Sequence, residues 1–202
     1  MFNFCTAWQA TWSSLGLIPN PDCFDELIAR YSAPHRHYHG LQHLAECLQL
    51  FRAFAASAEH PSEVEIALWF HDAIYEPLRH DNEQRSADWA HDVLLTAGAA
   101  HPIADRVHAL IMATRHTAEP EGLDAQLVVD IDLAILGAAP ERFAEYERQV
   151  RAEYGHVPGF LFRRKRQAIL KQFLSRPALY GTASMRDRFE LRARENLIAT
   201  IS

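Results

Sequence analysis

The placement of proline and glycine constrains this chain most strongly, because both residues punctuate it as helices require. Four prolines each precede a long stretch of helix formers, where the missing N–H of a first-turn proline would be unpaired in any case. They are Pro61, Pro102, Pro140 and Pro158. Three glycines stand just beyond such stretches, where a helix ends most easily in a left-handed residue. They are Gly98, Gly137 and Gly155.

This punctuation predicts helices near 3–15, 21–32, 38–58, 61–75, 81–97, 102–116, 124–136, 140–154, 158–175 and 183–201. Only the runs ALWFHDAIY and QLVVDIDLAIL resemble strands, and their apolar residues fit helical spacing equally well, with no hairpin signal beside them. No internal repeat, low-complexity segment or linker divides the chain. We therefore expect an all-α fold, a helical bundle that forms a single domain over residues 1–202.

The formal net charge of −6 argues against long nucleic acids and anionic membranes as partners, because both bind cationic surfaces. The basic run RRKR at 163–166 is expected to form a solvated helix face. No run of about eighteen apolar residues predicts a membrane span, and the N-terminus lacks the pattern of a signal peptide. Cys5, Cys23 and Cys47 show no tight spacing and fit small buried residues of a reducing compartment, so we expect a cytoplasmic protein.

The helix expected over 61–75 carries a histidine in the middle of its apolar face. Ala67 and Leu68 lie one turn from His71, and Asp72 follows it directly. Burying an ionised carboxylate beside an imidazole costs free energy unless a cation offsets it. A core histidine satisfied by a hydrogen bond is the competing interpretation.

A second buried carboxylate is predicted in LVVDIDLAILG. The residues three and four positions from Asp132 are all apolar, so its side chain should face the core, whereas Asp130 has more mixed neighbours. An arginine such as Arg36 or Arg115, or a helix N-terminus, could be the partner of Asp132. A metal cation is the alternative.

The segment RYSAPHRHYHGLQHL holds four of the twelve histidines, and one of them, His43, flanks the apolar face of the next helix. With His71, Asp72 and Asp132 it makes two imidazoles and two carboxylates from three helices. This ligand set suits one divalent cation such as Mn²⁺, Fe²⁺, Co²⁺, Ni²⁺ or Mg²⁺. A closed structural zinc site usually includes cysteine, and we expect none to be placed for it.

The order His43, His71-Asp72, Asp132 on an all-helical chain resembles the HD-domain superfamily of metal-dependent phosphohydrolases. The segments RYSAPHRHYHGLQHL, WFHDAIYEP, DNEQRSADWA, DIDLAILG and ARENL are together similar, over nearly the full length, to the bacterial family of predicted metal-dependent HD phosphohydrolases. The resemblance implies a bundle of the HD-domain type and hydrolysis of a phosphate ester or anhydride. In the family pattern the first metal ligand falls on His43 rather than His39, and the last falls on Asp132.

Further roles can be assigned around this ligand set. Asp72 is expected to be catalytic as well as a ligand, and Glu83 is the candidate acid or base. A first-turn acid favoured by the helix dipole is an equal alternative for Glu83. His39 is expected to lie beside the ligands or toward the substrate, and His35 and His37 are expected to be solvated.

Arginines near the motifs could bind a phosphate group, although each could instead be a surface or ion-pair residue. They are Arg36, Arg79 and Arg115. Lys165 or Arg166 could join them if the C-terminal helices close over the site.

The expected substrate is a small phosphorylated metabolite, first of all a nucleotide, and a homodimer is left open. Two other functions remain open: a di-iron oxygenase of the HD fold, and a non-catalytic nucleotide-binding regulatory module. The oxygenase would need further histidines between His71 and Asp132, and none of those present sits centrally in an apolar stripe. They are His91, His101, His108 and His116.

Overall fold

A computed structural model describes residues 2–201, and within that range it contains ten α-helices and no strand. The α-helices are α1 (Phe4–Ser14), α2 (Pro21–Tyr31), α3 (Leu41–Phe54), α4 (Pro61–Phe70), α5 (Asn82–Thr96), α6 (His101–Ala113), α7 (Leu123–Asp132), α8 (Pro140–Glu153), α9 (Gly159–Leu174) and α10 (Ala183–Ile201). Two short 3₁₀ helices, η1 (Ala55–Ser57) and η2 (Leu133–Gly137), follow α3 and α7. The predicted all-α fold is confirmed. No described helix is both long enough and apolar enough to cross a bilayer.

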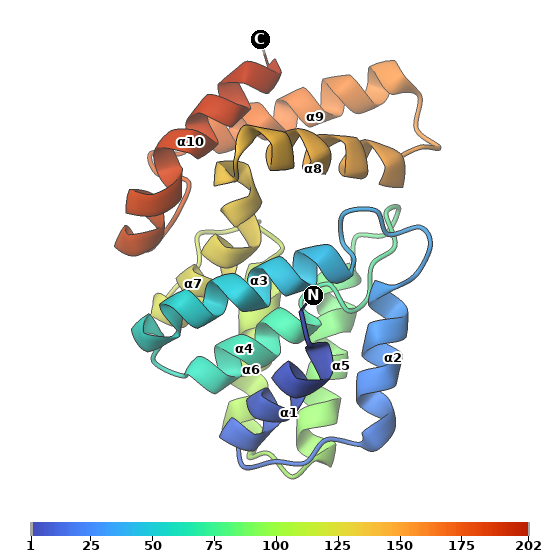
Figure 1. The fold of residues 1–202 in the computed structure, drawn as a ribbon, viewed down its shortest axis with the longest axis vertical. Coiled ribbons are helices and arrows are strands. Elements are labelled where there is room, and N and C mark those ends of the chain that lie inside the picture. Colours follow the sequence, from blue (N-terminus) through green and yellow to red (C-terminus); the bar gives the residue numbers. More distant parts are fainter. Residues whose placement is uncertain (1, 202) are drawn as a thin grey trace.

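Helix α4 lies at the centre of the larger part of the molecule, where it packs against α1, α3, α5, α6 and α7 (Figure 1). Every residue from Ile66 to Phe70 is fully buried, so the C-terminal half of this helix is apolar on all sides. Helices α8, α9 and α10 form the opposite end of the molecule, at the top of Figure 1, and α3 crosses between the two parts. Helix α3, which carries the candidate ligand His43, therefore lies between the two parts of the molecule.

The prolines and glycines that were predicted to mark helix ends act in different ways. Prolines begin α4, α6 and α8 as expected, and Gly98 adopts a left-handed φ of 90° after α5. Gly137 instead permits a close approach, because a Cβ added there would lie 2.7 Å from the Cβ of Phe189 on α10. This glycine allows α10 to pack against η2.

Of the helix boundaries that differ from those predicted, three lie beside candidate ligands. α3 begins at Leu41 rather than 38, α4 ends at Phe70 rather than 75, and α7 gives way to η2 after Asp132 rather than running to 136. The early end of α4 has a visible cause. Arg36 donates hydrogen bonds to the carbonyl oxygens of Asp72 (2.5 Å) and Ala73 (2.9 Å), which replace the partners that a continuing helix would supply.

Candidate metal centre

Four side chains from three separate segments of the sequence converge where α3, α4 and α7 meet. The Nε2 atom of His43 lies 3.1 Å from Nε2 of His71 and 3.2 Å from Oδ1 of Asp132. Nε2 of His71 lies 3.2 Å from Oδ2 of Asp72. One ligand atom from each of the four residues falls within 4.8 Å of the others. The structure thus brings together the four residues that the sequence singled out.

The electrostatics of this group favour a bound cation. Both histidines are buried, and the side chains of Asp72 and Asp132 are only 17% and 16% exposed. Oδ2 of Asp72 has no hydrogen-bond partner within residues 2–201, and a buried carboxylate oxygen without one is unfavourable. Burial would raise the pKa of Asp132, but hydrogen bonds from His116, His43 and His71 hold that pKa well below its usual value. Two ionised carboxylates and two imidazoles fit a divalent metal.

His71 is oriented by the helix that precedes it. Its Nδ1 lies 2.8 Å from the carbonyl oxygen of Leu68, and because a carbonyl only accepts, Nδ1 carries the proton. Nε2 is therefore the ring nitrogen that faces Asp72 and Asp132, and it can bind a metal once it has lost its proton. Metal-binding histidines are commonly fixed by such a backbone hydrogen bond.

The two aspartates of α7 have separate partners. Asp132 faces the ligand group, whereas the buried carboxylate of Asp130 accepts hydrogen bonds from the amides of Gly181 (2.7 Å) and Thr182 (2.8 Å). The Thr182 hydroxyl also donates to it at 2.7 Å. Asp130 therefore anchors the start of α10, and the helical-face prediction that preferred Asp132 agrees with this placement.

The expectation that no cysteine is placed near the ligands was wrong. Sγ of Cys47 lies 3.7 Å from both ring nitrogens of His43, one helical turn away. Burial raises the pKa of the Cys47 thiol well above its usual value, which favours the protonated, weakly ligating form. Cys23 is also buried, but Cys5 is exposed, contrary to the expectation that all three are buried.

His116 lies beside the candidate ligands, although the sequence pattern suggested it only as one of four histidines for the oxygenase alternative. Its Nε2 lies 3.1 Å from Oδ2 of Asp132, the oxygen turned away from His43. His116 follows the end of α6 with a φ of 55°, a left-handed conformation that is uncommon for residues other than glycine. Helical periodicity could not have identified it, because the residue lies beyond the helix.

Glu153 is the second residue that was missed. Its Oε1 accepts hydrogen bonds from the backbone amides of His37, Tyr38 and His39 at 2.9, 2.8 and 2.9 Å. Its Oε2 lies 2.8 Å from the Tyr75 hydroxyl and 2.7 Å from Nδ1 of His39. A sequence signal did exist, because Glu153 continues the buried α8 face formed by Phe143, Tyr146 and Val150. The test that selected Asp132 would not have selected Glu153 as clearly, because Gln149 and His156 are among the residues three and four positions from it.

A cavity of about 450 Å³ opens beside Asp132. Its lining includes several groups that can carry charge or a proton: His39, Glu83, Arg115, His116 and Arg176. Arg115 is exposed and Arg176 half-buried, and neither guanidinium forms an ion pair in the described part of the chain. Glu83 lies in the first turn of α5, where the helix dipole favours a carboxylate. It also lines the cavity, as the role of acid or base requires, so its position agrees with both interpretations. His35 and His37 are exposed, as expected.

The other two predicted phosphate-binding arginines lie outside this cavity. Besides its bonds after α4, Arg36 donates to the carbonyl oxygen of His39 at 3.0 Å, so it supports the backbone around the ligands. Arg79 forms an exposed ion pair with Asp81, with Nε and Oδ1 2.7 Å apart. Both therefore have contacts other than a substrate, and Arg115 is the one of the three that faces the cavity.

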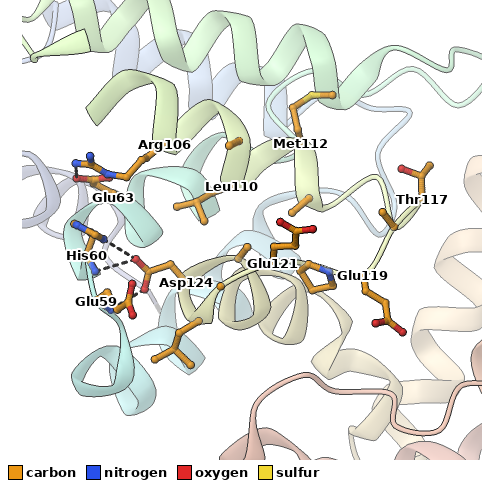
Figure 2. A pocket seen from close by; sticks show the side chains of 17 residues that line it. Glu59, His60, Glu63, Arg106, Leu110, Met112, Thr117, Glu119, Glu121 and Asp124 are labelled. Atoms are coloured by element: carbon orange, nitrogen blue, oxygen red, sulfur yellow. Dashed lines mark hydrogen bonds and ion pairs between the residues drawn. The ribbon is translucent and has the colours of Figure 1, made fainter. Parts of the chain in front are cut away.

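Another group of candidate ligands, Glu59, His60 and Asp124, borders a separate cavity of about 400 Å³ (Figure 2). The Asp124 carboxylate accepts hydrogen bonds from the amides of Glu59 (2.7 Å) and His60 (2.9 Å). It also lies 3.0 Å from Nδ1 of His60. Through these bonds the Asp124 carboxylate holds the turn before α4 in place. Its oxygens are therefore already paired, and this group needs no cation.

In comparisons with protein-family models, curated proteins and solved structures, the chain matches none. The resemblance to HD-domain phosphohydrolases therefore stays a prediction from the sequence motif.

Proposed function

We propose that the chain is a metal-dependent phosphohydrolase of the HD-domain type that acts on a small phosphorylated metabolite. One observation carries the proposal. The side chains of His43, His71, Asp72 and Asp132 converge around a buried Asp72 oxygen that accepts no hydrogen bond within residues 2–201, and Asp132 borders a cavity lined by two arginines that form no ion pair within that range. Open nitrogen-and-oxygen sites of this kind suit Mn²⁺, Co²⁺, Ni²⁺, Fe²⁺ or Mg²⁺.

A divalent cation, when bound, supplies Lewis acidity toward water and toward a phosphoryl oxygen. The remaining work falls to the chain's own side chains. Arg115 and Arg176 hold the phosphate in the cavity through charge-assisted hydrogen bonds. Glu83 and His39 line the same cavity and can hold or move a proton. Glu153 keeps Nδ1 of His39 occupied, so Nε2 is the nitrogen of His39 left for the substrate.

A nucleotide remains the first substrate proposed, and the aromatic residues near the motifs differ in whether they could stack on its base. Trp69 is fully buried in the core, and Tyr75 stacks on His39 at 4.1 Å between ring centroids. Tyr38 does line the cavity, as do Tyr146, Tyr154 and Phe173. The acidic chain also disfavours long nucleic acids as substrates.

A di-iron oxygenase is the second candidate, and His116 is the observation in its favour. His116 supplies one further imidazole next to Asp132. His91 and His108 instead pair with Asp105 and Asp88, at 3.1 and 3.0 Å, on the exposed faces of α5 and α6. One additional histidine supports a single metal more than a pair.

The test combines metal analysis with a substrate panel. The purified protein should contain about one divalent metal per chain, and Asp72→Ala should lose both the metal and the hydrolysis. The panel is nucleoside mono-, di- and triphosphates, sugar phosphates and a chromogenic phosphodiester, each with Mn²⁺, Co²⁺, Ni²⁺ and Mg²⁺. Full metal occupancy in Asp72→Ala would refute the ligand set. Two irons with oxygen consumption would support the oxygenase, and a metal-loaded protein inactive on the whole panel would support a regulatory binding module.

A further inference from the structure

A second cavity adjoins the one at the metal centre. Its volume is about 440 Å³, within the usual range for small-molecule sites. The two cavities share four lining residues, His39, Tyr146, Tyr154 and Ile169, so they meet at the edge of the candidate metal centre. We call the second cavity the outer chamber.

The walls of the outer chamber are mainly apolar. Val150 of α8 and Phe162 of α9 form part of them, together with Pro77 of the segment between α4 and α5. Leu78 and Leu161 also line it, and they are 71% and 44% exposed. Covering their apolar surface with a ligand would be favourable, because that surface would be removed from water.

Few polar groups of the outer chamber are free to bind a ligand. Arg166 is engaged with the Glu147 carboxylate and lies over the Tyr146 ring. His80 and the exposed Lys165 are the remaining charged or titratable groups that are not shared with the first cavity. A polyhydroxylated sugar would therefore lose hydrogen bonds to water without gaining enough replacements.

We infer that the outer chamber binds an apolar, flat organic group of the substrate, while the phosphate lies at Arg115 and Arg176. The substrate class is thus a phosphate ester that carries an aromatic group, such as the base of a nucleotide, rather than a simple sugar phosphate. This inference rests on the proposed function, because it assigns the phosphate to the metal-side cavity. Tyr154 and Phe162, with ring centroids 6.0 Å apart, provide aromatic surface for such a group.

Binding of two non-hydrolysable probes, phenylphosphonate and methylphosphonate, to the Mn²⁺-loaded protein tests the inference by calorimetry. Both carry the same anionic group, so their difference reports on the outer chamber alone. We expect phenylphosphonate to bind at least tenfold more tightly. The double variant Leu78→Ser/Leu161→Ser should lose most of this preference and keep its affinity for methylphosphonate. Leu191→Ser is the matched control, because Leu191 is 76% exposed on α10 and lines neither cavity.

The outcomes separate the two proposals. Equal affinity for the two phosphonates would overturn the outer-chamber inference and leave the proposed hydrolase intact. A preference that survives in the double variant, or that Leu191→Ser removes equally, would also overturn it. A protein that takes up no metal and binds neither phosphonate would refute the proposed function itself, and the inference with it.

Discussion

Nδ1 of His39, in the loop before α3, lies 2.7 Å from Oε2 of Glu153 at the end of α8, although 114 residues separate them. The same carboxylate accepts the backbone amides of residues 37 to 39 through its other oxygen. One buried side chain of the C-terminal helices therefore shapes the loop that leads into His43. The two parts of the molecule are joined at the candidate metal centre.

Glu153→Gln should lower the free energy of unfolding by about 2–3 kcal/mol at neutral pH. The amide oxygen can still accept from the backbone, but the amide nitrogen would face Nδ1–H of His39 and the Tyr75 hydroxyl, which leaves buried groups unpaired. Urea denaturation measures the change. Glu145→Gln on the same helix is the control, because the Glu145 side chain is 41% exposed and should change stability by less than about 0.5 kcal/mol. Equal effects of the two substitutions would contradict the role of Glu153.

The stability that Glu153 supplies should depend on pH in the acid range. Burial would raise its pKa, but hydrogen bonds from His39 and the loop amides lower it from 4.5 to about 2. A carboxylate with a lowered pKa stabilises the fold above its ordinary pKa and loses that contribution as the pH falls through the lowered value. The shift corresponds to about 3 kcal/mol.

We therefore expect the stability difference between wild type and Glu153→Gln to be constant above about pH 5 and to shrink toward pH 2. Denaturant titrations at a series of pH values would show this. Other carboxylates also titrate in this range, so the comparison with the variant is the informative quantity. A difference that does not change with pH would refute the assigned ionisation.

Substitutions of the two aspartates in the segment DIDL, Asp130 and Asp132, should have separate effects on metal binding and on stability. Asp132→Asn should reduce metal affinity by well over tenfold, because this carboxylate faces the other ligands. Asp130→Asn should leave the metal content close to wild type and lower the melting temperature, since it weakens the bonds to Gly181 and Thr182. Metal analysis and thermal unfolding of both variants test this. Equal metal loss in the two, or a larger loss in Asp130→Asn, would contradict the placement.

Arg36 and Arg79 offer a matched pair for testing support of the metal centre. Arg36→Lys should reduce both stability and metal affinity, because a lysine cannot bind the carbonyl oxygens of His39, Asp72 and Ala73 together. Arg79→Lys should change neither by much, since its ion pair with Asp81 is exposed. Unfolding and metal titration of the two variants are the measurements. A raised KM with unchanged metal affinity in Arg36→Lys would instead return Arg36 to a role in substrate binding.

The sequence by itself predicted the helical architecture and the four candidate ligands that the structure brings together. Proline and glycine report local backbone preferences, which do not need tertiary contacts to be recognised. The apolar neighbours of Asp132 and His71 likewise showed which face of each helix would be buried, because helical periodicity is a property of one segment. Polar residues on such faces were correctly expected to be close to one another.

Only the tertiary structure decided which residue lies opposite which. The partners of Arg36 and the contact of His116 with Asp132 join different segments or depend on where a helix stops. The end of α4 itself is set by the Arg36 guanidinium, which is 36 residues earlier in the chain than Asp72. Periodicity specifies a direction from one helix axis, whereas a contact also requires the relative position of a second segment, which packing alone supplies.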